Sequence, residues 1–110
     1  MSKFNVCVIG PRTLVGQNLL EILEERSFPV EAMFLLDAGE EVGESATFAG
    51  TDYAVRDIAS FDFSQARIAF FCGPATLSAE YGPKAADAGC VVIDDSDRFR
   101  MDPAVPLVVP

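Results

Sequence analysis

The sequence predicts an α/β fold in which a mostly parallel sheet carries helices on both faces and includes a small hairpin. Three observations predict it. Short apolar runs that end at glycine or aspartate recur along the chain, segments with helical spacing of apolar residues lie between them, and two short strand-like segments flank a glycine-containing turn. Because crossovers between parallel strands are right-handed, we expect the first strand near the centre of the sheet.

The first half of the chain supplies a strand, a helix and a second strand. The apolar run at 3–9 ends at a glycine and predicts a buried strand. Apolar residues recur at helical spacing through Leu14–Glu25, and Thr13 is the expected N-cap of that helix. A second strand is predicted at 30–36 and ends in Asp37, which an acidic loop follows.

The second half supplies the hairpin, more strands and a second helix. The hairpin is predicted from Ser45–Phe48 and residues 53–56. Strands are predicted at 68–72, 90–94 and 106–109, and helices at 58–65 and 76–88. Within the last helix, Pro83 is expected to begin a new turn or to kink the helix, and Gly89 to end it.

Composition excludes several classes of function. The net charge of −9 over 110 residues argues against nucleic acid and anionic membrane as partners. The sequence holds no apolar run of about 18 residues, and Met1 leads directly into a strand, so we expect neither a membrane span nor a signal peptide. Three dispersed cysteines and no histidine predict a reduced, cytoplasmic chain with buried thiols and no zinc site.

The segment from Gly10 to Gly16 joins the first strand to the first helix, which is the context of a Rossmann-type dinucleotide-binding loop. Gly10 permits the tight turn and Gly16 lets the helix lie close to the strand. Thr13 stands where the middle glycine of such loops approaches the pyrophosphate, and Arg12 offers a compensating charge. With Leu14 and Val15, these residues are the predicted cofactor-binding loop; the alternative is a strand-to-helix turn that binds nothing.

Further candidate cofactor residues end the second and the later apolar strands. Asp37 lies at the spacing from the loop at which an acidic residue meets the adenosine ribose, which favours NAD over NADP. Glu40, Glu41 and Glu44 would repel a 2′-phosphate further. The alternative is that Asp37 only starts a solvated turn. The segment Cys72-Gly73-Pro74 is predicted to reach the same edge of the sheet.

Four runs carry a resemblance to a known family: FPV at 28–30, FDFS at 61–64, EYGPKAADAGCVVID at 80–94 and FRMDPAVPLVVP at 99–110. They resemble the NAD(P)-binding domain of aspartate-semialdehyde dehydrogenases over nearly the whole chain. The resemblance implies an oxidoreductase of amino-acid biosynthesis that reductively dephosphorylates aspartyl phosphate with NADP. It also implies a cysteine nucleophile and a histidine base beyond residue 110.

The resemblance further implies that residues 1–110 are a single domain, a fragment of a homodimeric protein without its catalytic and dimerisation domain. It places Arg100 at the position that grips the substrate phosphate, although a surface ion pair is the alternative for Arg100.

The departures from the family pattern collect at the cofactor side. The family loop reads close to GATGxVG, whereas this one is Gly-Pro-Arg-Thr-Leu-Val-Gly. Cys72-Gly73-Pro74-Ala75 stands where the family usually has small residues with paired glycines, and Asp95-Ser96-Asp97 stands where it has Asn-Ser-Ser. Two functions therefore stay open: a cofactor-binding enzyme domain that uses NAD or NADP, and a non-catalytic paralogue that serves as a scaffold and binds no cofactor. A third interpretation is a redox protein that uses Cys72.

Overall fold

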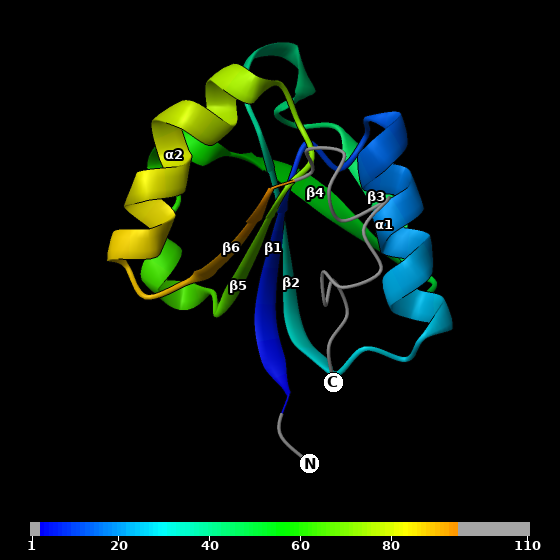
Figure 1. Cartoon of the computed structure of the whole chain (residues 1–110). Coiled ribbons are helices and arrows are strands. Elements are labelled where there is room, and N and C mark those ends of the chain that lie inside the picture. The colour runs from blue at the N-terminus through cyan, green and yellow to red at the C-terminus, as the bar shows by residue number, and fades with distance from the viewer. Residues whose placement is uncertain (1–2, 95–110) are drawn as a thin grey trace.

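The structure, a computed structural model, describes residues 3–94 and shows one six-stranded sheet between helices (Figure 1). The strand order is β3-β4-β2-β1-β5-β6, and only β3 is antiparallel to its neighbour. The elements are β1 (Phe4–Ile9), α1 (Leu14–Glu25), β2 (Val30–Asp37), β3 (Ser45–Phe48), β4 (Thr51–Asp57), β5 (Ile68–Phe71), α2 (Ala75–Asp87) and β6 (Val91–Asp94).

The first strand is central, as predicted. β1 pairs with β2 on one side, where Val8 lies opposite Leu35, and with β5 on the other, where Val8 lies opposite Phe70. On one side of β1 the chain adds β2 and then β4. It then returns and adds β5 and β6 on the other side of β1. This reversal creates a switch point between β1 and β5 at the carboxyl edge of the sheet, where open α/β sheets bind ligands.

The two helices cover opposite faces of the sheet. Successive strand residues point to opposite faces, so Val6 and Val8 pack with the buried leucines of α1, whereas Cys7 and Ile9 pack with Ala85 of α2. Figure 1 shows the two helices flanking the strands. The predicted arrangement of helices on both faces is confirmed.

The predicted single helix at 58–65 is wrong. The structure has two 3₁₀ turns there, Ile58–Ser60 and Phe63–Gln65. The Asp57 carboxylate accepts from the N–H of Ala59 at 2.9 Å, and the Asp62 carboxylate accepts from that of Ser64 at 3.0 Å. Each aspartate therefore starts a turn of its own, because such side chains compete with continuous helix for backbone donors.

The second helix differs slightly from the prediction. α2 begins at Ala75 and remains one helix through Pro83 to Asp87. Gly89 has a φ of +98°, the left-handed conformation expected just after a helix end. The predicted strand at 106–109 lies outside the described residues.

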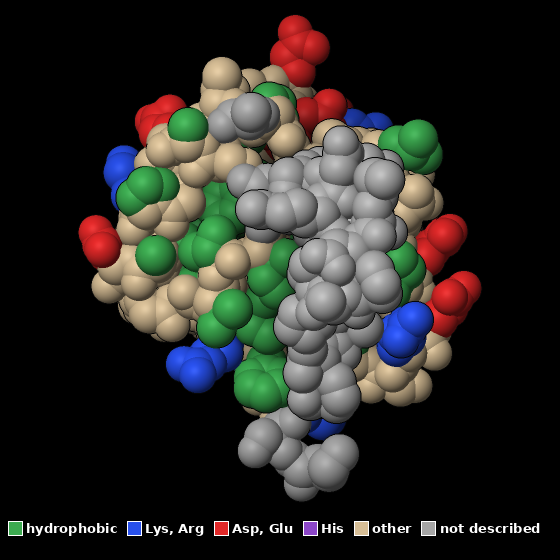
Figure 2. All heavy atoms as spheres, viewed as in Figure 1, with side chains coloured by type: hydrophobic (Ala, Val, Ile, Leu, Met, Phe, Trp, Pro, Cys, Tyr) green, Lys and Arg blue, Asp and Glu red, His purple; other side chains and the backbone are tan. Residues whose placement is uncertain are grey.

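Apolar surface remains at the β6 edge of the described sheet. Val91 and Val92 of β6 are 49% and 36% exposed. On the face shown in Figure 2, hydrophobic side chains gather over the middle of the molecule, and the charged side chains lie toward its rim. Within residues 3–94, no helix is long and apolar enough to cross a membrane.

Candidate functional site at the carboxyl edge of the sheet

The loop between β1 and α1 is packed backbone against backbone. Gly10 has a φ of +81°, and a Cβ added to it would lie 2.6 Å from the Cα of Gly73. A Cβ added to Gly16 would lie 2.2 Å from the carbonyl oxygen of Gly10. The predicted steric roles are therefore confirmed: Gly10 makes the turn, and Gly16 lets α1 approach β1.

Thr13 ties this loop to the end of β5. Its Oγ1 accepts the N–H of Gly16 at 3.0 Å, which caps α1 as predicted. The same hydroxyl lies 2.9 Å from the carbonyl oxygens of Gly10 and Cys72 and donates its one proton to this pair of acceptors. The Thr13 side chain thus links the loop to the start of α1 and to the end of β5.

The start of α1 faces the carboxyl edge with backbone donors and an apolar side chain. The first N–H groups of a helix precede its own hydrogen-bonding ladder, and those of Leu14 and Val15 occupy this position. Leu14 is 75% exposed, whereas Val15 packs against the core. These N–H groups and the positive end of the helix dipole suit an anion such as a pyrophosphate.

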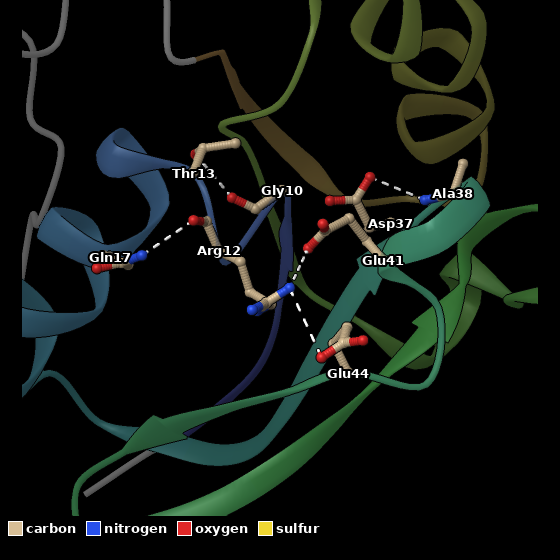
Figure 3. A network of polar contacts seen from close by, with 8 residues as sticks. All are labelled: Gly10, Arg12, Thr13, Gln17, Asp37, Ala38, Glu41 and Glu44. Atoms are coloured by element: carbon tan, nitrogen blue, oxygen red, sulfur yellow. Dashed lines mark hydrogen bonds and ion pairs between the residues drawn. The ribbon is translucent and has the colours of Figure 1, made fainter.

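Arg12 is engaged by the acidic segment that follows β2 (Figure 3). Its Nη1 lies 2.8 Å from Oε1 of Glu41 and 3.8 Å from Oε1 of Glu44. Its carbonyl oxygen accepts the side-chain amide of Gln17 at 2.9 Å. The charge that Arg12 was predicted to offer the cofactor is therefore shared with two carboxylates, a pairing that sequence reasoning missed.

Asp37 ends β2 in a buried position and not in a solvated turn. It is 8% exposed, and its Oδ1 accepts the N–H of Ala38 at 2.8 Å. Burial raises the pKa of this carboxyl and the nearby negative charge of Glu41 raises it further, while the hydrogen bond from Ala38 opposes both. Figure 3 shows Asp37 and Arg12 on either side of Glu41.

The end of β5 forms the other wall of the loop. Gly73 contacts Gly10, and Pro74 is the N-cap residue of α2. The carbonyl oxygen of Cys72 meets the Thr13 hydroxyl, and the Cys72 residue is buried. The structure thus brings Cys72, Gly73 and the Gly10 loop together, as predicted. Burial of Cys72 disfavours the redox interpretation, because reactive thiols are accessible.

The other two cysteines belong to the core. Cys7 and Cys90 are buried, and burial raises the pKa of both thiols. The Cys90 thiol lies 3.1 Å from the carbonyl oxygens of Phe63 and Ala66. Among residues 3–94, no three Cys, Asp or Glu side chains are grouped to hold a metal ion.

A polar groove that sequence reasoning missed runs from Arg12 along α1 beside β3. Gln17, Glu21 and Glu24 line it from the helix, Ser45 and Thr47 line it from the strand, and Leu20 and Ala46 contribute apolar surface. The Glu24 carboxylate also accepts the N–H of Ala49 at 3.1 Å. No sequence motif marks this groove, because it depends on where the hairpin lies relative to α1. Arg100, the predicted phosphate ligand, lies outside the described residues.

Residues 5–110 match the family described as "Semialdehyde dehydrogenase, NAD binding domain". Aspartate-semialdehyde dehydrogenase from Shewanella violacea is 45% identical over 108 residues, which cover 98% of this chain and 32% of that protein. This chain spans about a third of the length of the curated relatives it matches.

Solved structures show the same fold. Aspartate semialdehyde dehydrogenase II from Vibrio cholerae, complexed with ASA, is 42% identical with a TM-score of 0.82 and covers 92% of this chain and 33% of that chain. Aspartate semialdehyde dehydrogenase from Candida albicans, solved with NADP, is 18% identical with a TM-score of 0.69, covering 92% of this chain and 32% of that one. The second likeness concerns the fold alone.

Proposed function

Because this chain belongs to the semialdehyde dehydrogenase NAD-binding-domain family, we propose that it holds a nicotinamide dinucleotide for an aspartate-semialdehyde dehydrogenase-like oxidoreductase and prefers NAD to NADP. The observation that carries the proposal is the close approach of Gly10, Gly16 and Gly73 at the switch point of the sheet. Side chains at Gly10 and Gly16 would displace the backbone that a pyrophosphate must approach.

Each part of the site has a proposed task. The N–H groups of Leu14 and Val15 would hold the pyrophosphate at the positive end of α1. Gly73 and Pro74 would form the wall opposite this loop, beside Cys72. Asp37, held by Ala38, would accept hydrogen bonds from the adenosine ribose.

The preference for NAD is supported by charge. The Asp37 carboxylate is buried beside Glu41, so a 2′-phosphate there would meet two like charges in a poorly solvated place. A ribose 2′-hydroxyl, in contrast, can donate a hydrogen bond to the Asp37 carboxylate. The site therefore favours the cofactor that carries the hydroxyl.

This chain would bind the cofactor, and the rest of a longer protein would supply the catalytic residues. The nicotinamide would supply hydride transfer, and this chain's residues would bind and orient it. The resemblance to the family places the cysteine nucleophile and the histidine base beyond residue 110, and gives Arg100 the substrate phosphate. Guanidinium suits that task because its donors form a planar, permanently charged fork.

A second candidate function is a non-catalytic scaffold derived from this family. The polar side chains of the loop already have partners. Thr13 forms hydrogen bonds within the loop, and Arg12 pairs with Glu41 and Glu44, which follow β2. A loop closed in this way would keep the fold without the cofactor. Partner binding would then be the retained function.

Titration of the chain with NAD and with NADP, followed by NMR shift mapping, separates these candidates. We expect NAD to shift the amide signals of residues 10–16 and Asp37, and NADP to shift them only at higher concentration. The titration should be run at low and moderate salt, because salt screens the charges of Glu40, Glu41 and Glu44. Absence of shifts with both cofactors at millimolar concentration would reject dinucleotide binding and favour the scaffold.

A further inference from the structure

Arg12 is a cation at the mouth of the proposed cofactor site, and acidic side chains occupy it. Its guanidinium contacts Glu41 at 2.8 Å and lies 3.8 Å from Glu44. The side chains of Arg12 and Glu41 are each 40% exposed, so water and solutes reach the pair. Exposed ion pairs of this kind are weak, so an anion that forms paired hydrogen bonds with the guanidinium can compete for Arg12.

The pair lies beside the position proposed for the adenosine ribose. Glu41 is close enough to Asp37 for its charge to act on the Asp37 carboxyl, and Figure 3 shows its side chain between Asp37 and Arg12. A phosphate on the ribose 2′ position would therefore arrive next to Glu41 and near the guanidinium. Guanidinium binds phosphate through paired, charge-assisted hydrogen bonds.

We propose that Arg12 is a 2′-phosphate receptor that Glu41, assisted by Glu44, keeps occupied, so that Glu41 determines which dinucleotide the site selects. This inference rests on the proposed function and deepens it. NADP is disfavoured twice: the acidic side chains repel its 2′-phosphate, and they hold the arginine that would bind it. NAD has no 2′-phosphate for Arg12 to bind, so it leaves the ion pair intact.

Occupation of Arg12 and simple repulsion of the 2′-phosphate predict different effects of removing a single acidic side chain. Repulsion depends on the number of acidic charges near the ribose, and removal of any of them would relieve it. Occupation depends on contact with Arg12, which Glu41 makes. Glu40 is a matched control: it is the neighbouring exposed glutamate within the same 3₁₀ turn, Gly39–Glu41, and the ion pairs of Arg12 involve Glu41 and Glu44.

The test compares NAD and NADP affinities, by calorimetry, for the chain itself and for Glu41→Gln, Glu40→Gln and Arg12→Gln/Glu41→Gln. We expect Glu41→Gln to tighten NADP binding about fivefold, because it frees the guanidinium from an exposed ion pair and removes one repulsive charge. Glu40→Gln should change it less than about threefold, because an exposed charge without contact is screened by salt. The double variant should lose most of the gain.

NAD affinity separates this inference from the proposed function. If NAD binds the unaltered chain, Glu41→Gln and Glu40→Gln alike, the fold and the cofactor site are intact, and the NADP results decide the role of Arg12. The NADP affinity of the double variant is compared with its own NAD affinity. Equal gains in Glu41→Gln and Glu40→Gln, or a gain that survives in the double variant, would overturn occupation of Arg12. Failure of NAD and NADP to bind any of the four proteins would reject the proposed function, and this inference with it.

Discussion

The backbone of the loop between β1 and α1 and the charged rim around it differ in how tightly the fold constrains them. Gly10, Gly16 and Gly73 meet at distances that leave no room for a Cβ on Gly10 or Gly16. Arg12 and Glu41, in contrast, are 40% exposed and touch through one ion pair. The backbone can change only if β1 and α1 move apart, whereas the rim can change its charge without disturbing the core. Within one site, steric fit preserves the loop and electrostatics is free to set its selectivity.

Gly16→Ala tests the constrained half and carries the largest expected effect. Its Cβ would lie 2.2 Å from the carbonyl oxygen of Gly10, so the helix must shift, and we expect a loss of about 3 kcal/mol or more in the free energy of unfolding. Urea denaturation measures it. Gly82→Ala in α2 is the matched control, because nothing lies within 4 Å of its Cβ and the better helix propensity should stabilise the chain by up to about 1 kcal/mol. Similar stabilities for the two variants would refute the steric account.

Thr13→Val lies between the two halves and should have an intermediate effect. It keeps the shape of the side chain but removes the cap on Gly16 and the bond to the loop carbonyls. We expect a loss of about 1–2 kcal/mol, the range for a lost N-cap, whereas Thr13→Ser should stay near the original stability. Thermal denaturation of both variants checks this. A valine variant as stable as the serine variant would show that the hydroxyl is dispensable.

Asp37→Asn tests the buried carboxylate beside the rim and should have the smallest effect on stability. Because the folded-state pKa of Asp37 is raised, folding loses stability as the pH rises from the unfolded value of 3.8 through the folded pKa. The asparagine variant should thus have a slightly higher free energy of unfolding than the original chain at pH 7. This advantage should shrink as the pH falls toward 3.8, while NAD affinity at pH 7 decreases. A variant that is less stable at pH 7 would contradict the assigned cost of burial.

The sequence predicted the constrained half better than the rim. Helical spacing and an N-cap threonine delimit Leu14–Glu25, which is the helix observed. The spacing of the glycines identified the loop, because positions that require a residue without a Cβ can be recognised in the local sequence. The turns at 58–65 depended on two aspartate side chains that outcompeted a helix, and the Arg12–Glu41 pair depended on how β2 and the loop meet in space. Local patterns do not encode such contacts.

The central position of β1 has a consequence for how the chain reaches this fold. β1 precedes both of its neighbours in the chain: it needs β2 on one side and β5 on the other, and Val6 pairs with Ile68 across most of the described chain. Until β5 has been synthesised, one edge of β1 lies open, and such unpaired apolar edges attract other chains. Closure of so long a loop also makes this pairing a slow step, as in other folds rich in distant contacts. The nascent chain is therefore most exposed to misassembly just before residues 68–71 arrive, and shielding of β1 at that stage should govern the yield of folded protein.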